Sequence, residues 1–207
     1  MSTLFPIRSR EPIAAGKFRL VYEHPDDRNL LIKVIRPEMI DKRWGSGTPW
    51  YKRQRRMKQY ALFVREINEF VATCADNGKA PSFAQKITGF IETDLGLGLI
   101  TEAARDREGN LAPPLKKLLA ERQFDDEARA ALDRFIEALL ESNIVVADMH
   151  SGNLVYAHNE TEGNHFVLID GIGATTLIPT KVWSRRLNLA SKRSKISKLL
   201  RSVAKYR

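Results

Sequence analysis

The chain has 207 residues, a length that fits one large domain or two small lobes. Hydrophobic residues make up 43% and charged residues 29%, as in soluble globular proteins, and no apolar run approaches the roughly 20 residues of a membrane span. A single cysteine, Cys74, excludes an internal disulfide and a zinc site of several cysteines. Residues 1–10 contain no apolar signal core, so we expect a cytoplasmic protein, and the net charge of +9 favours anionic partners.

The N-terminal half is rich in predicted strands. Apolar runs bounded by turn residues predict strands over residues 13–16, 18–23, 30–35, 84–92 and 98–102. Two glycines and a proline predict a loop over residues 42–49. Apolar residues at helical spacing then predict a helix over residues 51–75. Together these elements predict a strand-rich N-terminal lobe over residues 1–103.

The C-terminal half is predicted to be mainly helical. Apolar residues on one face predict helices over residues 115–122 and 125–142. Shorter apolar runs predict strands over residues 144–146, 154–157 and 165–169. Strands followed by helices indicate an α+β fold. We expect a C-terminal catalytic lobe over residues 104–180 and a basic helix or tail over residues 181–207.

The candidate chemistry lies in a polar loop and at the end of an apolar run farther along the chain. The loop reads Asp148-Met149-His150-Ser151-Gly152-Asn153, and the run Leu168-Ile169 ends in Asp170. Phosphoryl transfer needs a group that orients or deprotonates the attacking hydroxyl, together with oxygen ligands for Mg²⁺. Asp148, Asn153 and Asp170 meet these needs. An ordinary turn is the alternative for the loop, because Asp, Ser, Gly and Asn all favour turns.

The order of these motifs resembles the protein-kinase-like superfamily. The loop from Asp148 to Leu154 is similar to the catalytic loop of its aminoglycoside-phosphotransferase branch. The whole chain more closely resembles the YrbL family of PhoP regulatory network proteins. Two runs carry that match: Ile91-Glu92-Thr93-Asp94 with Gly96 and Gly98, and Asp170-Gly171-Ile172-Gly173 through Pro179 to Trp183-Ser184. The resemblance implies a two-lobed protein-kinase-like fold with a strand-rich N-terminal lobe and a short helical C-terminal lobe.

The resemblance also implies a role for each polar residue. Asp148 would accept or orient the proton of the substrate hydroxyl, and Asn153 and Asp170 would hold the Mg²⁺ that bridges the ATP phosphates. The implied cofactors are ATP and Mg²⁺, and the implied catalytic residues are Asp148 and Asn153. No second histidine lies at ligand spacing from His150, so we expect this residue to position the loop.

The N-terminal lobe supplies the predicted nucleotide-binding residues. Lys33 lies in a strand that otherwise reads as buried, and a buried ammonium needs a partner. Glu66 on the following helix is the candidate, although Glu69 lies one turn away and could replace it. The pair resembles the kinase arrangement in which a strand lysine binds the α- and β-phosphates. The alternative is a lysine on an exposed face of the strand.

The predicted phosphate-binding turn departs from the kinase pattern. Gly16 is a single glycine where kinases have up to three. It could let backbone N–H groups approach a phosphate, with added charge from Lys17 or Arg19. A plain hairpin turn is the alternative.

Basic residues concentrate in two segments without Asp or Glu, residues 42–65 and residues 181–207. Such segments attract phosphate-bearing partners, so the unknown acceptor can itself be anionic, and nucleic acid or an anionic membrane surface are candidate partners of the tail. A solvated face is one alternative. Another is a helix that packs the face from Ile196 to Leu200 against the C-terminal lobe.

These observations leave three hypotheses about function. The first is an ATP- and Mg²⁺-dependent phosphotransferase that acts on a hydroxyl of an unknown acceptor. The second is a pseudokinase or regulatory binding module that presents a basic surface to an anionic partner. It draws on the single glycine and on the short stretch after Asp170, which lacks an Ala-Pro-Glu ending. The third is a nucleic-acid or anionic-surface binder whose affinity falls steeply with salt.

Overall fold

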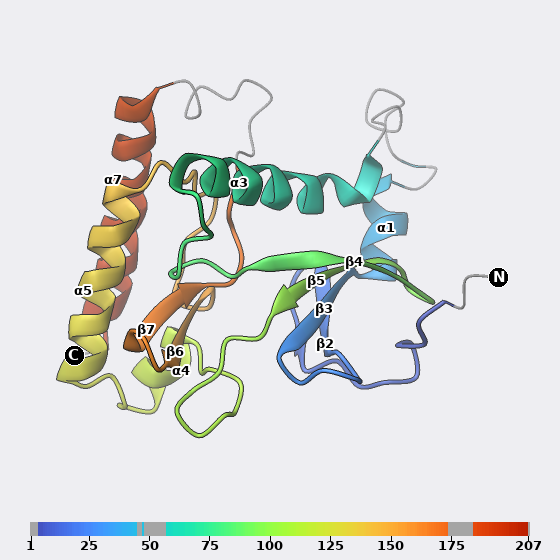
Figure 1. Cartoon of the computed structure of the whole chain (residues 1–207), viewed down its shortest axis with the longest axis horizontal. Helices are drawn as coiled ribbons and strands as arrows, with labels where there is room; N and C mark the ends of the chain where they lie inside the picture. The colour runs from blue at the N-terminus through green and yellow to red at the C-terminus, as the bar shows by residue number, and fades with distance from the viewer. Residues whose placement is uncertain (1–3, 45–46, 48–56, 174–183, 207) are drawn as a thin grey trace. The chain divides into compact units, whose positions relative to one another are not determined.

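The computed structural model describes residues 4–44, 47, 57–173 and 184–206 (Figure 1). The chain divides into two compact units. Unit 1 contains residues 1–64 and 86–103, and unit 2 contains residues 65–85 and 104–207. One division between the units falls between Ala103 and Ala104. Residues 65–85 and the basic C-terminal segment both belong to unit 2.

Unit 1 is built on a five-stranded antiparallel sheet with strand order β1-β2-β3-β5-β4. Its strands are β1 (Ala14–Ala15), β2 (Arg19–Glu23), β3 (Leu30–Ile35), β4 (Ile87–Thr93) and β5 (Gly96–Glu102). Each strand region predicted for the N-terminal half therefore contains a strand. β5 begins earlier than predicted, because the turn before it is tight: Gly96 has φ +101°, and Thr93 Oγ1 donates to the Gly96 carbonyl over 2.6 Å.

Lys33 lies in the middle of this sheet. β3 pairs with β2 and with β5, and the residues opposite Lys33 are Val21 and Leu99. Residues Leu31–Ile35 are all buried, and Lys33 itself is only 6% exposed. The alternative of a lysine on an exposed strand face is therefore wrong.

The segment after β3 differs from its prediction. Helix α1 (Pro37–Trp44) ends within the predicted loop, because its last three residues, 42–44, are the first three that the sequence assigns to that loop. Proline suits the first position of a helix, where its missing N–H costs nothing, and Glu38 adds a favourable charge in the first turn. The rest of the predicted loop, apart from Gly47, lies outside the described residues.

The long predicted helix is confirmed in its C-terminal part. α3 (Ala61–Asn77) follows a short 3₁₀ turn, η1 (Lys58–Tyr60), and residues 51–56 lie outside the described residues. Gly78, with φ +69°, follows its last residue, a common way to end a helix.

Unit 2 combines helices with one hairpin. Its elements besides most of α3 are α4 (Leu115–Ala120), α5 (Asp126–Glu141), β6 (Leu154–Asn159), β7 (Gly163–Leu168) and α7 (Arg185–Ala204). Asp125 caps α5, because its side chain accepts a 2.8 Å hydrogen bond from the N–H of Ala128. The strand predicted over residues 144–146 is wrong: within the described residues only Val146 makes a bridge, to Ile172.

One apolar core unites these elements. Leu115, Leu132, Phe135, Leu154 and Phe166 are among its buried members, and they come from both helices and from the hairpin. α7 lies alongside α5 and adds Ile196, Leu199 and Val203 (Figure 1). Of the alternatives for this segment, the structure therefore shows the helix that packs Ile196 and Leu199 against the C-terminal core, although Leu200 is 42% exposed. Among the helices described, none is both long and apolar enough to cross a bilayer.

Candidate functional site

The polar loop of residues 148–153, here the motif loop, is paired with the segment that follows β7. The N–H groups of Ala147 and Asp148 donate to the carbonyl of Gly171 over 2.7 and 3.1 Å. The N–H of Gly173 donates to the carbonyl of Val145 over 2.7 Å. These backbone bonds bring the start of the motif loop beside the residue that follows Asp170.

The other end of the motif loop is held by the hairpin. Asn153 immediately precedes β6 and Asp170 comes two residues after β7, so the antiparallel pairing of Leu154 with Leu168 brings both to one end of the hairpin. The carbonyl of Asn153 accepts a 2.9 Å hydrogen bond from Ile169. Both ends of the motif loop thus contact the neighbours of Asp170, and unit 2 gathers the backbone that carries all three predicted residues.

Two glycines after Asp170 permit this close approach. Gly171 has φ +82°, and a Cβ placed on it would overlap the carbonyl oxygen of Asp148. Gly173 has φ +94°, and a Cβ there would come within 2.6 Å of the Arg65 carbonyl oxygen. A larger residue at position 171 would push the motif loop away, and one at position 173 would meet the backbone of α3. The sequence prediction did not assign the glycines these roles.

Asp148 is open to solvent and lies near His150. The Asp148 side chain is 70% exposed, and its Oδ2 lies 3.9 Å from Nε2 of His150. The Nδ1 of His150 accepts a 3.0 Å hydrogen bond from the N–H of Gly152, so Nε2 is the nitrogen that bears the proton. The distance of 3.9 Å is too long for a direct hydrogen bond. The ring therefore braces the turn of the motif loop and directs an N–H toward the Asp148 carboxylate.

The donor set at this end of the hairpin fits Mg²⁺. Asn153 and Asp170 are half-buried, and Asp170 Oδ1 accepts a 2.6 Å hydrogen bond from the N–H of Gly171, which orients the carboxylate. Mg²⁺ commonly takes one or two carboxylates, with other ligands from amide, water and phosphate oxygens. The described residues contain no group of three or more His, Cys, Asp or Glu that could hold a metal ion.

α3 contributes two glutamates of different character. Glu66 is 7% exposed. Glu69 is half-buried, and its Oε1 accepts a 2.5 Å hydrogen bond from the N–H of Val145. Burial raises the pKa of the Glu69 carboxyl, while the Val145 hydrogen bond and the charge of Lys192 act in the opposite direction. Glu69 therefore anchors the chain just before the motif loop, a role the sequence prediction did not assign.

Gly16 lies in the exposed turn between β1 and β2. Its N–H donates to the Arg19 carbonyl over 2.9 Å, and its own carbonyl accepts a 3.1 Å hydrogen bond from Arg36. A Cβ added at Gly16 would lie 3.6 Å from the Arg19 carbonyl oxygen, an ordinary contact. The fold of the turn therefore does not require glycine at this position.

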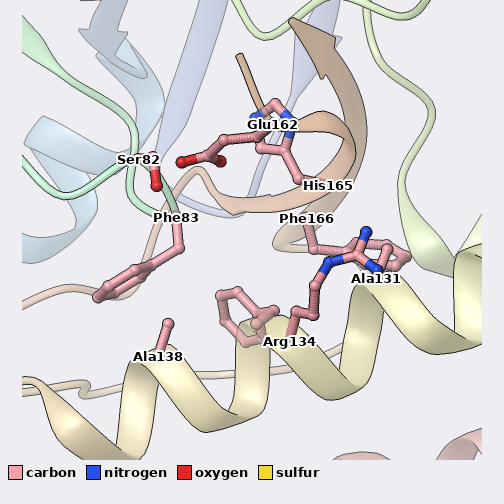
Figure 2. Close-up of a pocket in the computed structure, with 9 residues that line it drawn as sticks. Ser82, Phe83, Ala131, Arg134, Ala138, Glu162, His165 and Phe166 are labelled. Atoms are coloured by element: carbon pink, nitrogen blue, oxygen red, sulfur yellow. The ribbon is translucent and has the colours of Figure 1, made fainter.

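A pocket of about 300 Å³ lies elsewhere in unit 2. Figure 2 shows α5 on one side of it and residues of the hairpin on another. Its lining among the described residues includes none of the predicted phosphoryl-transfer residues and consists of Ser82, Phe83, Ala131, Arg134, Phe135, Ala138, Glu162, His165 and Phe166.

Comparison with solved structures defines the class of fold. The chain is similar to the crystal structure of Rad53 1-466 in complex with AMP-PNP, with a TM-score of 0.51 and 13% sequence identity. The match covers 78% of this chain and 38% of the Rad53 chain, so this chain spans well under half of that protein. An α+β fold of the protein-kinase type, as the sequence predicts, is confirmed.

The family is shown by sequence. The profile described as PhoP regulatory network protein YrbL matches residues 6–204, and the chain belongs to this family. The protein of Escherichia coli (strain K12) named "Uncharacterized protein YrbL" is 24% identical over 183 residues, which cover 86% of this chain and 78% of the relative. The protein of the same name from Shigella flexneri matches with the same identity and coverage.

Proposed function

We propose that this protein is an ATP- and Mg²⁺-dependent phosphotransferase that moves the γ-phosphoryl group of ATP to a hydroxyl of an acceptor. One observation carries the proposal: the motif loop is bonded at both ends to the neighbours of Asp170. The N–H of Asp148 donates to the Gly171 carbonyl, and the carbonyl of Asn153 accepts from Ile169. Phosphoryl transfer depends on positioning and on charge neutralisation, which is what such a clustered arrangement of polar residues can supply.

Each residue of the motif has a proposed task. Asp148 accepts or orients the proton of the acceptor hydroxyl, and its 70% exposure leaves room for an acceptor to reach it. Asn153 and Asp170 are the proposed Mg²⁺ ligands. Bound Mg²⁺ would neutralise charge on the ATP phosphates.

The nucleotide-binding residues of this proposal are Lys33, Glu66 and Gly16. Lys33 would bind the α- and β-phosphates and Glu66 would orient it, as the kinase resemblance implies. Each of the two side chains is buried within the structure, at 6% and 7% exposure, and a buried charge is tolerated only with partners. Gly16 would allow close approach of the β1–β2 turn to phosphate. That Rad53 was crystallised with AMP-PNP supports nucleotide binding as a property to test here.

The acceptor is proposed to be a hydroxyl-bearing molecule that can be anionic. The outer face of α7 is cationic, with exposed Arg186, Arg193, Lys198 and Arg201, and this helix contains no acidic residue. Nucleic acid and anionic membrane surfaces are the further proposed partners of this face, and a cytoplasmic location would suit ATP as substrate. Binding to either should weaken as salt is raised, because released counterions contribute most of the affinity.

A second candidate function is a pseudokinase that presents this basic face to an anionic partner. The observation that favours it is the β1–β2 turn, where Gly16 is the single glycine and its N–H is already bonded to Arg19. Membership of the PhoP regulatory network family is compatible with a regulatory role. This function predicts a stable protein that consumes no ATP with any acceptor, water included.

Thermal unfolding with and without saturating Mg·ATP tests the proposal. Ligand at about a hundred times its dissociation constant stabilises by about 2.7 kcal/mol, a shift of several degrees for a chain of this size. Asp170→Asn is the sharpest variant, because its side-chain oxygen can still accept from Gly171 while the carboxylate charge is lost. We expect the Mg²⁺-dependent shift in the wild type and its loss in Asp170→Asn.

Asp148→Asn should keep the thermal shift and lose phosphate transfer, measured with water and with candidate hydroxyl acceptors. Unchanged turnover in Asp148→Asn would overturn the catalytic assignment. A wild type without any Mg·ATP shift would favour the pseudokinase.

A further inference from the structure

Helix α7 carries two polar side chains on its buried face. Asn188 and Lys192 are 5% and 1% exposed, and they continue the stripe formed by Ile196, Leu199 and Val203. The three apolar residues join the core of unit 2. The two polar residues lie instead where α5 ends and the chain runs toward the motif loop.

Lys192 caps the end of α5. Its Nζ donates to the carbonyls of Leu139 and Ser142, both over 2.7 Å, and lies 3.2 Å from Ser142 Oγ. The last carbonyls of a helix have no partners within the helix, and a positive charge there is favoured by the helix dipole. All three donors of the ammonium group are therefore used by one short segment.

Asn188 holds the next two residues. Its Nδ2 donates to the carbonyl of Asn143 over 2.8 Å and to that of Ile144 over 3.2 Å. Its Oδ1 is buried and has no hydrogen-bond partner among the described residues. The side-chain amide of Asn188 thus donates two hydrogen bonds through Nδ2 and leaves its Oδ1 acceptor unsatisfied.

Val145 completes the series. Its N–H donates to Glu69 on α3, and its carbonyl accepts from Gly173. Residues 142–145, here the connecting segment, belong to no helix or strand, so no regular ladder fixes their path. Side chains of α7 and α3 bond to several of their backbone groups instead, and the motif loop begins at Asp148, shortly after this segment.

From these contacts we propose, on the basis of the function proposed above, that Asn188 and Lys192 are positioning residues that hold the connecting segment and, through it, set the place of Asp148. Catalytic groups must be held closely, and a displacement of about 1 Å can lower a rate about a hundredfold. The motif loop is bonded to Gly171 at its start and to Ile169 at its end, and the α7 contacts add support to the segment that precedes the loop.

The energetics of Lys192 favour this role over simple packing. Ile196 and Leu199 show that the same face of α7 accommodates aliphatic side chains. Burying an ammonium group is costly unless it is fully hydrogen-bonded. Burial lowers the pKa of Lys192 from 10.5 to about 8; the nearby Glu69 carboxylate acts against this decrease and Arg185 adds to it. The cost of burying the Lys192 ammonium group is offset by its hydrogen bonds to the end of α5, which an aliphatic residue could not make.

Hydrogen exchange measured by mass spectrometry on the full chain tests the positioning directly. Lys192→Met keeps an unbranched apolar side chain that stops one atom short of Nζ, and it removes the donors. Asn188→Leu keeps the shape of the side chain and removes the amide. Lys198→Met, on the exposed face of the same helix, removes an equal charge and is the matched control. We expect exchange of amides in residues 142–149 to accelerate about tenfold or more in the first two variants, with β6 and β7 unchanged. Wild-type exchange in these residues in both variants would overturn the proposal.

ATP turnover provides the second measurement. We expect kcat to fall about tenfold or more in Lys192→Met and Asn188→Leu, with the KM for ATP within about threefold of the wild type, because positioning of Asp148 is lost while nucleotide binding remains. Lys79→Met removes an equal charge from an exposed residue outside α7, and its turnover should match the wild type. A fall in kcat with unaltered exchange would contradict positioning. A wild type that consumes no ATP would remove the proposed function, and exchange alone would then decide whether α7 orders the motif loop. If Lys192→Met does not fold, Asn188→Leu decides both measurements.

Discussion

Gly171 accepts a hydrogen bond from the N–H of Asp148 through its carbonyl, and the carbonyl oxygen of Asp148 lies where a Cβ on Gly171 would have to be. This mutual contact joins the motif loop to the segment that carries Asp170. It requires a backbone with φ +82° at position 171 and no side chain there. The glycine after Asp170 is therefore a steric condition for the site.

Gly171→Ala should strongly destabilise unit 2 or displace the motif loop. Gly109→Ala is the matched control, because Gly109 has φ +81° but no atom within 4 Å of an added Cβ. The control should lose about 1–3 kcal/mol from the left-handed backbone alone. Denaturant unfolding of both variants isolates the steric contribution, and equal losses would show that the loop moves aside without cost.

Glu69→Ala should destabilise the protein by about 1–3 kcal/mol, because the N–H of Val145 would lose its acceptor. Glu69→Gln keeps a side-chain oxygen that can accept this hydrogen bond, so it should lose clearly less. Denaturant midpoints at one pH compare the two variants. Equal losses would mean that the charge, and not the hydrogen bond, is what Glu69 contributes.

Gly16→Ala should leave folding stability within about 1 kcal/mol of the wild type, because the added Cβ would make only an ordinary contact with Arg19. If the β1–β2 turn approaches a phosphate as proposed, the same variant should reduce the stabilisation by Mg·ATP. Calorimetry or thermal shift with and without Mg·ATP measures both effects. An unaltered nucleotide shift would assign Gly16 to the turn alone.

Lys192 should make stability depend on pH in the alkaline range. Its pKa is about 8 in the folded protein and 10.5 for a free side chain, so the unfolded state binds more protons between these values. Stability contributed by this residue therefore rises as pH increases from 8 to 10.5, by at most about 1.4 kcal/mol per pH unit. The difference in unfolding free energy between the wild type and Lys192→Met should grow over this interval.

Lys198→Met serves as the control for that measurement, since its side chain is exposed on the same helix. Its difference from the wild type should stay nearly constant with pH. A constant difference for Lys192→Met as well would mean that burial does not lower the pKa of Lys192.

Local patterns in the sequence determined much of the fold. β3 has the same bounds as the strand predicted over residues 30–35. α5 is one residue shorter at each end than the helix predicted over residues 125–142. The burial of Lys33 and the kinase-like class were also predicted, the first from apolar neighbours and the second from a resemblance of motifs. Such features depend on residues only a few positions apart, so the spacing of apolar residues and the presence of turn-forming residues are enough to predict them.

Tertiary structure alone decided how the site is held. Glu69 bonds to Val145, Asn188 to Ile144 and Lys192 to Leu139, and in each pair the partners come from segments far apart in sequence. The predicted strand over residues 144–146 failed for the same reason: these apolar residues are buried, but side chains of α3 and α7 replace the sheet partner that a strand would need. A hydrogen-bond partner that long-range packing brings to a segment does not alter the local pattern of apolar residues in that segment. Such a partner therefore cannot be predicted from that pattern.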